Sequence, residues 1–273
     1  MSPLRIIVPV KQVPETGKAR MDEETGTIQR EGVESIVNPL DLYAIETALR
    51  IAEAHDGEVV ALSMGPPGAR EALREAIAMG CDRAVLLSSR DFAGSDTFAT
   101  SYTLSRAVRT MGGFDLIICG ERATDGDTGQ VGPAMAAFLD VPPVTYVSRI
   151  EHIADRRLRV RRLVETGYEV ISCPLPCVIT VVKEIADPRL PTLRGKRRAR
   201  DAEIRALGPD DIGADPAKIG LGGSPTRVVR ITRPRVARQG QKVRVKKEQD
   251  LGPVVDRIVS FLDERLPSGG ADG

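Results

Sequence analysis

The sequence predicts an α/β fold in which a doubly wound, mostly parallel sheet carries helices on both faces. Short apolar runs typical of fully buried parallel strands recur through the first half of the chain. A segment whose apolar residues have helical spacing follows these runs, so strands and helices alternate. From residue 144 strands follow one another without helices, the periodicity lapses after residue 187, and an apolar helical stripe returns only near the end. We therefore expect two parts, an α/β domain at residues 1–187 and an extended C-terminal arm with a terminal helix at 188–273.

The elements of the first half follow from local patterns. Buried strands are predicted at residues 4–10, 58–64, 83–87 and 115–119. Helices are predicted from residue 39, over 69–80, after the capping sequence at 95–97 and in the segment around Pro133. Asn38 would be the N-cap of the first helix, with Pro39 at its first position. Its apolar stripe comprises Ile45, Ala48, Leu49 and Ala52. A weak alternation over residues 21–34 predicts a small hairpin.

The second half changes character. Strands without intervening helices are predicted at residues 144–147, 158–163, 168–171 and 177–182, with Gly167 closing a hairpin. A short strand at 227–232 and an amphipathic helix follow the arm. The apolar face of this helix comprises Leu251, Val254, Val255, Ile258, Leu262 and Leu266. Such a helix either folds back on its own domain or covers another chain.

Composition excludes several classes of protein. The 273 residues can bury a full core, and the net charge is +1. Basic residues cluster at 194–200 and 233–247, but neither run contains the aromatic side chains that stack on bases, so we expect no nucleic-acid partner. The four cysteines lack CxxC spacing, which indicates a reducing compartment. We find no signal-peptide core and no apolar run that could span a bilayer, so we expect a cytoplasmic protein without direct membrane insertion.

The loop between the strand at 115–119 and the helix around Pro133 is the candidate ligand site. Such loops lie at the carboxyl edge of a doubly wound sheet, where α/β folds bind ligands. Gly126, Gly129 and Gly132 permit close backbone approach and positive φ, and the free N–H groups at the helix start attract an anion such as phosphate. A nucleotide is the expected ligand. A Walker loop is excluded because no Lys-Ser/Thr pair follows the glycines, and the loop carries no cation after Arg122.

The polar residues of this loop have distinct expected functions. Asp125 and Asp127 would repel a phosphate, so we expect them to bind ribose or to shape the backbone. Backbone N–H groups, Thr128 and Gln130 would then face the phosphate. The alternative is an ordinary solvated Asp-Gly turn.

Other strand ends converge on the same edge. Pro9 ends the first strand, Met64 and Gly65 end the second, and Thr97 and Thr100 follow the third. The two threonines either donate hydroxyls to phosphate from a helix start or act as ordinary capping residues.

No catalytic residue or metal ligand can be assigned from the sequence. The two histidines, His55 and His152, lie in polar surroundings without a serine or cysteine partner in a known motif. The carboxylates show no spacing that singles out an acid and base pair. Any redox chemistry would therefore come from a bound cofactor.

Several motifs together resemble one family. They are VPVKQVPET (8–16), VNPLDLYAIETALR (37–50), ALSMGP (61–66), EAIAMGCDRAVLL (75–87) and CGERATDGDTGQVGP (119–133). Residues 160–181, with Arg162, Glu165 and Glu169, resemble a family signature, from which Thr166 departs. Over nearly its whole length the chain resembles the β subunit of electron transfer flavoproteins.

This resemblance implies a Rossmann-like, adenine-nucleotide-binding domain in a heterodimer whose α subunit holds an electron-transferring FAD. The implied nucleotide contacts, together with the cleft residues above, are Pro9, Asn38, Pro39, Leu40, Asp41, Met64, Gly65, Thr97, Thr100, Ala123, Thr124, Asp125, Gly126, Asp127, Thr128, Gly129, Gln130, Val131 and Gly132. In mitochondrial-type members the nucleotide is a structural AMP. In clostridial-like, electron-bifurcating members it is a second FAD, which accepts a hydride from NADH. Residues 94–104 and 125–133 resemble the second group, so we expect FAD, with AMP as the alternative.

The resemblance also implies partners. The segment 191–193 resembles the loop that docks an acyl-CoA or other dehydrogenase, or a quinone-linked oxidoreductase, with Leu193 as its apolar anchor. The C-terminal arm resembles the segment that wraps the α subunit. Oxidoreductase activity would then require the α subunit. The alternatives are a structural AMP-binding subunit of a simple electron shuttle and a nucleotide-binding module without redox activity.

Overall fold

The computed structural model describes residues 3–15, 20–21, 28–29, 35–229, 243–245, 247–248 and 251–265. The chain divides into two compact units, Met1–Ile231 and Thr232–Gly273. Residues 188–231 therefore belong to the same unit as the sheet, whereas the sequence assigns them to the arm.

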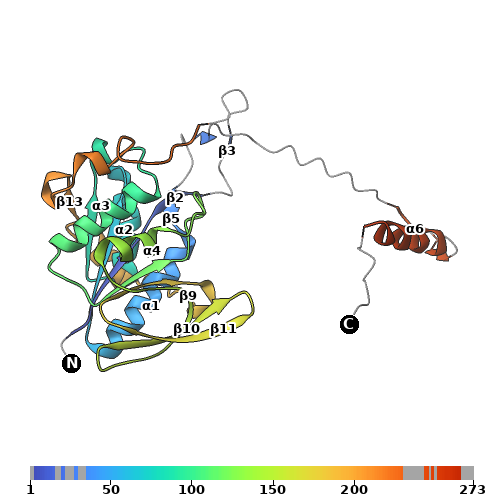
Figure 1. The fold of residues 1–273 in the computed structure, drawn as a ribbon, viewed down its shortest axis with the longest axis horizontal. Helices are drawn as coiled ribbons and strands as arrows, with labels where there is room; N and C mark the ends of the chain where they lie inside the picture. Colours follow the sequence, from blue (N-terminus) through green and yellow to red (C-terminus); the bar gives the residue numbers. More distant parts are fainter. Residues whose placement is uncertain are drawn as a thin grey trace. The chain divides into compact units, whose positions relative to one another are not determined.

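A nine-stranded sheet forms the centre of the first unit, in the order β11-β10-β9-β12-β8-β1-β6-β7-β13 (Figure 1). Its strands are β1 (Arg5–Pro9), β6 (Glu58–Met64), β7 (Arg83–Leu87), β8 (Leu116–Gly120), β9 (Pro143–Ala154), β10 (Arg157–Val164), β11 (Gly167–Pro174), β12 (Cys177–Val181) and β13 (Arg205–Leu207). All neighbours from β9 to β13 in this order pair in parallel, and β10 pairs antiparallel with β9 and β11. The predicted mostly parallel sheet is confirmed.

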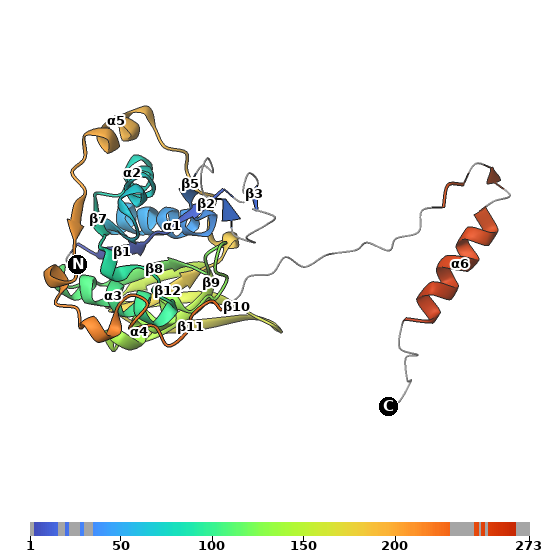
Figure 2. The same cartoon turned by 90° about the horizontal axis from the view of Figure 1, so that it is seen from above.

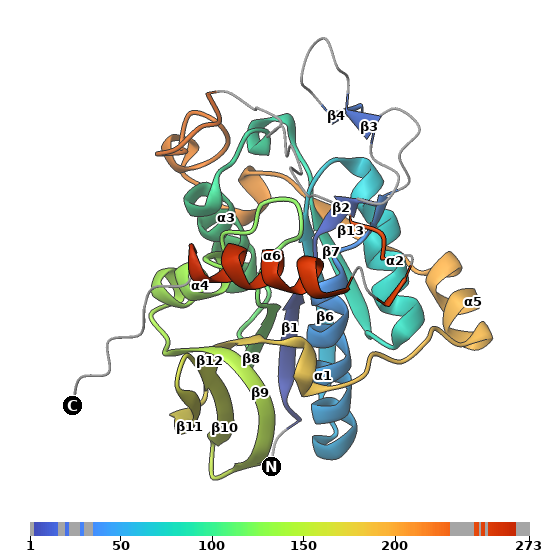
Figure 3. The same ribbon diagram turned by 90° about the vertical axis from the view of Figure 1, so that its right-hand side faces the viewer.

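Helices cover both faces of this sheet. They are α1 (Pro39–His55), α2 (Arg70–Met79), α3 (Thr97–Thr110), α4 (Val131–Leu139) and α5 (Leu193–Asp201). The alternation of β1 shows how the two layers form, because Ile6 packs in a core cluster with Ile45 of α1 while Ile7 packs in another with Leu104 of α3. Thus α1 and α2 lie on one side of the strands and α3 and α4 on the other (Figure 2, Figure 3).

The predicted helices form with small shifts. The stripe of α1 is buried, α2 ends at Gly80 as its C-cap, and Asp96 caps α3 by accepting a hydrogen bond from the Ala99 N–H at 3.0 Å. Helix α4 begins at Val131, so Pro133 lies inside its first turn, where a missing N–H leaves no intrahelical bond unmade.

Three strands of the second half are longer than the sequence predicts, whereas β12 ends one residue before the predicted 177–182. β9, β10 and β11 form a continuous antiparallel meander. The turn between β9 and β10 consists of Asp155 and Arg156, both with positive φ, and it was missed because it contains no glycine or asparagine. Two short strands that were not predicted, β2 (Gln12–Pro14) and β5 (Ser35–Val37), pair with each other. β3 (Arg20–Met21) pairs with β4 (Ile28–Gln29) around the predicted hairpin at residues 21–34.

The prediction of an extended arm directly after residue 187 is wrong. The basic run forms α5, in which Thr192 accepts a capping hydrogen bond from the Gly195 N–H at 2.9 Å and Ala199 is the buried residue. Arg198 holds α5 to α2 by donating to the Ile77 and Cys81 carbonyls, at 2.8 Å each. β13 then extends the main sheet beside β7. The sequence did not predict α5 because most of its residues are charged and Ala199 is its buried residue.

The last predicted elements have different outcomes. Residues 227–229 are not a strand, and the remainder of the predicted strand at 227–232 lies outside the described residues. In the second unit, α6 (Leu251–Asp263) confirms the amphipathic helix, and none of its residues is buried. Leu266, assigned to its apolar face, lies outside the described residues. None of the helices described in the structure is long and apolar enough to cross a membrane.

A candidate nucleotide site at the carboxyl edge of the sheet

The parallel strands bring the predicted site residues to one edge of the sheet. β1 ends at Pro9 and β6 at Met64, and the loop from β8 to α4 begins after Gly120. Pro9 is buried and Met64 is half-buried, so they line the base of this edge. The loop residues 124–128 are exposed and therefore accessible to a ligand.

Asn38 fastens the start of the loop. Its side chain is fully buried, and its Nδ2 donates to Asp41 Oδ1 at 2.9 Å and to the Arg122 carbonyl at 3.0 Å. Its Oδ1 accepts from the Thr124 N–H at 3.2 Å. Asn38 occupies the N-cap position of α1 but makes no side-chain capping bond. The predicted N-cap position is therefore confirmed, with Pro39 at the first position of the helix, but the Asn38 amide binds the loop instead of a backbone N–H of α1.

Asp41 joins the end of β1 to the same network. Its Oδ2 accepts from the Lys11 N–H at 2.7 Å. Burial raises the pKa of Asp41 to about 7, even though the hydrogen bonds from Lys11 and Asn38 favour the ionised form. A Cβ at Gly120 would lie 2.5 Å from Asp41 Oδ1, so only glycine permits this close approach.

Both aspartates of the loop have cationic partners. Lys11 Nζ lies 2.6 Å from Asp125 Oδ1, and Arg122 Nη1 lies 3.1 Å from Asp127 Oδ1. The sequence indicated a loop without a cation after Arg122, but Lys11 approaches from the end of β1, more than a hundred residues away in the chain. These pairs offset the negative charge that would repel a phosphate.

The glycines of the loop differ in function. Gly129 has a φ of 63°, and Asp127 has a φ of 50°. Gly132 is needed for packing, because a Cβ there would lie 2.6 Å from Thr180 Cγ2 in β12. Gly126 has neither a positive φ nor a close neighbour, so the predicted need for glycine holds at two of the three positions.

The start of α3 meets this loop. Thr97 Oγ1 lies 3.5 Å from Thr128 Oγ1, and Asp96 rather than Thr97 caps the helix. The sequence left open whether Thr97 caps this helix or binds phosphate, and the cap is Asp96. Thr100 lies one turn further, where its N–H donates to the Asp96 carbonyl. The starts of α3 and α4 and the loop thus come together at one place.

The remaining predicted contacts surround this place. Pro39 and Leu40 form the first turn of α1, and Gly65 follows β6 with its N–H bound to the Leu87 carbonyl. Ala123 is half-buried, Gln130 precedes α4 and Val131 begins it. Sequence reasoning missed Lys11 and Arg122, although a lysine directly after a buried strand was an available signal.

Comparisons with known proteins agree with this architecture. The profile of the electron transfer flavoprotein domain matches residues 25–212. An electron transfer flavoprotein subunit beta from Thermoanaerobacterium thermosaccharolyticum is 46% identical over 239 residues, which cover 87% of this chain and 91% of the relative. The chain belongs to the electron transfer flavoprotein family. Two further relatives are a caffeyl-CoA reductase-Etf complex subunit CarD from Acetobacterium woodii, 46% identical over 96% of this chain and 98% of the relative, and a protein FixA from Azorhizobium caulinodans, 40% identical over 97% and 95%.

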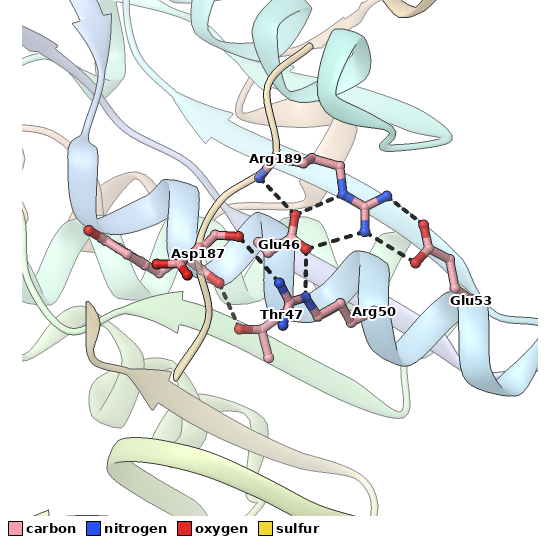
Figure 4. Close-up of polar contacts among 7 residues, drawn as sticks. Glu46, Thr47, Arg50, Glu53, Asp187 and Arg189 are labelled. Atoms are coloured by element: carbon pink, nitrogen blue, oxygen red, sulfur yellow. Dashed lines mark hydrogen bonds and ion pairs between the residues drawn. The ribbon is translucent and has the colours of Figure 1, made fainter. Parts of the chain in front are cut away.

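In this electron transfer flavoprotein chain, Leu193 is the predicted docking residue and does not belong to the candidate nucleotide site. It begins α5 with 88% of its surface exposed, and nearby Leu190 is 87% exposed. The segment before them is held by Arg189, whose N–H and Nε donate to Glu46 Oε2 at 3.1 and 2.8 Å (Figure 4). The same guanidinium also binds Glu53.

Glu46 is the centre of this cluster. Its side chain is only 3% exposed, and Arg50 Nε donates to its Oε1 at 2.6 Å. Burial alone would raise its pKa, but the hydrogen bonds from Arg189 and Arg50 outweigh burial and lower it. Arg50 also donates to the Asp187 carbonyl at 3.3 Å. Neither Arg189 nor Glu46 was identified from the sequence, because their pairing is visible only in the fold.

Proposed function

We propose that this chain is the β subunit of an electron transfer flavoprotein heterodimer. The carboxyl edge of its sheet would bind an adenine nucleotide, which we propose is an FAD in addition to the FAD of the α subunit. The observation that carries the proposal is the meeting of the α3 start, the α4 start and the charge-balanced loop. At a helix start the first N–H groups have no intrahelical acceptor and the helix dipole is positive, so both favour phosphate. AMP remains the alternative ligand.

The residues present fit a nucleotide phosphate. Asn38 fixes the loop entry, Lys11 and Arg122 neutralise its aspartates, and Gly132 brings α4 against β12. The N–H groups at the start of α4 would hold one phosphate, and the adjacent hydroxyls of Thr97 and Thr128 would hold a second. This second position favours a diphosphate such as that of FAD over AMP.

A bound flavin would supply the redox chemistry, with NADH as the expected donor. The chain's own residues bind and orient the nucleotide. The name of the CarD relative describes it as part of a caffeyl-CoA reductase-Etf complex, which supports a redox partner for this chain as well. We propose that Leu193, presented on α5, docks an acyl-CoA or other dehydrogenase, or a quinone-linked oxidoreductase, and that the second unit (Thr232–Gly273), which contains α6, binds the α subunit.

Binding measurements on nucleotide-depleted heterodimer test the choice of ligand. Thr97→Val removes one hydroxyl at the second phosphate position, so the Kd for FAD should rise about tenfold while the Kd for AMP stays unchanged. Thr110→Val, at the other end of α3, is the matched control, because its hydroxyl donates to the Ala107 carbonyl far along the helix. Equal losses for FAD and AMP would contradict the FAD assignment.

A further inference from the structure

Tyr146 has a backbone conformation that is unusual for a residue inside a strand. It lies within β9 with a φ of 57°. The other non-glycine residues with positive φ in the described chain are Asp56, Asp127, Asp140, Asp155 and Arg156. Asp56 and Asp140 are helix C-caps, and the others lie in loops or turns, where left-handed residues are common. A bulky aromatic residue in this region inside a strand is strained, and strain of this kind concentrates at functional sites.

A β-bulge produces this conformation. β9 pairs with β12 through Val144 opposite Ile179 and Val147 opposite Val181, so two residues of β9 lie opposite Thr180 alone. The Tyr146 N–H donates to Thr180 Oγ1 at 3.0 Å instead of to a backbone carbonyl. A bulge turns a side chain away from the direction that regular pleating would give it.

The bulge brings Tyr146 to the nucleotide loop. A Cβ placed on Gly129 would lie 3.8 Å from Tyr146 Oη, so the phenol reaches the loop just before α4. Thr180, the other half of the bulge, contacts Gly132 in the first turn of α4. Tyr146 is 46% exposed, and its hydroxyl makes no hydrogen bond with the residues that the structure describes. The strained residue therefore presents an available donor where the loop meets the helix.

We infer that the Tyr146 hydroxyl donates a hydrogen bond to the phosphate bound at the start of α4. This inference rests on the proposed nucleotide site and adds a binding residue to it. The strain in β9 is retained because it aims this hydroxyl at the phosphate. Relieving the strain would then raise the stability of the fold but weaken the binding of phosphate, as is common when stability and function compete.

Tyr146→Phe in the heterodimer with its α subunit is the decisive variant, because it removes only the hydroxyl. With nucleotide-depleted protein, the Kd for AMP should rise about tenfold, whereas the Kd for adenosine, which lacks a phosphate, should stay unchanged. Tyr146→Gly should weaken AMP at least as much without lowering the thermal midpoint of the nucleotide-free protein. Tyr168→Phe is the control for an exposed tyrosine of the same sheet, and Asp155→Gly is the control for relief of a left-handed residue. Both controls should bind AMP like the wild type.

The outcomes separate two failures. If the wild type binds AMP and Tyr146→Phe binds it equally well, the assignment of Tyr146 is overturned and the nucleotide site stands. An equal loss of adenosine and AMP binding also overturns it, because the hydroxyl would then act away from the phosphate. If the wild-type heterodimer neither carries nor binds FAD or AMP, the proposed function itself fails.

Discussion

Arg189→Met tests the cluster that holds the segment before Leu193. Removing one partner of a buried ion pair typically costs about 3–5 kcal/mol, because the other charge stays buried without compensation. Here Arg189 is 32% exposed and Arg50 still binds Glu46, so we expect a smaller loss, about 2–3 kcal/mol. For a unit of this size the thermal midpoint would fall by roughly 5–10 °C. Urea denaturation and thermal unfolding of the full chain measure the two quantities.

Matched variants separate burial from charge. Glu53 binds the same guanidinium but is 60% exposed, so Glu53→Gln should cost less than about 1 kcal/mol. The double variant Arg189→Met/Glu46→Gln should recover part of the loss, because no buried carboxylate remains unpaired.

The pH dependence of Arg189→Met follows from the lowered pKa of Glu46. A lowered pKa contributes stability above the unfolded value near 4.5, and this contribution is lost as the pH falls through the folded value. The difference between wild type and Arg189→Met should therefore shrink in acid. The reasoning would be refuted if, at pH 7, Arg189→Met lowered the free energy of unfolding no more than Glu53→Gln does.

Three further variants test the candidate nucleotide site. Because burial raises the pKa of Asp41 from 3.8 to about 7, wild-type stability should decrease as the pH rises through this range, by at most about 4 kcal/mol. Asp41→Asn should lose this slope in urea denaturation between about pH 4 and 7, and an unchanged slope would count against the assignment. Gly132→Ala places a methyl group against Thr180 and should lower stability by about 1–3 kcal/mol in thermal unfolding; no change would mean that α4 moves away freely. Lys11→Met should change stability by less than about 1 kcal/mol but raise the Kd for AMP in calorimetry, because Asp125 is left to repel phosphate; unchanged binding would place the phosphate elsewhere.

The central strands could be predicted because parallel strands buried on both faces have continuous apolar sequences. β6 and β7 begin and end at the predicted residues, 58–64 and 83–87. The loop from β8 to α4 could also be located from the sequence, because the alternation of strands and helices places it at the carboxyl edge of the sheet.

The missed features depend on contacts between distant parts of the chain. α5 and β13 are stabilised by α2 and β7, and a basic sequence gives little local sign of either. The partners of Asp125 and Glu46 come from Lys11 and Arg189, which the folded chain alone brings near. Asn38 is the N-cap residue of α1 as predicted, but the contacts of its buried amide with Arg122 and Thr124 could not be predicted from the sequence.

The nucleotide content of the purified heterodimer tests the central claim most directly. The chain is co-expressed with its α subunit, the complex is denatured, and the released FAD and AMP are quantified against protein. The account predicts one FAD from each subunit and no AMP. One FAD with one AMP would keep the nucleotide site but contradict the second flavin, and a single FAD without any further nucleotide, in an intact heterodimer, would contradict the site itself.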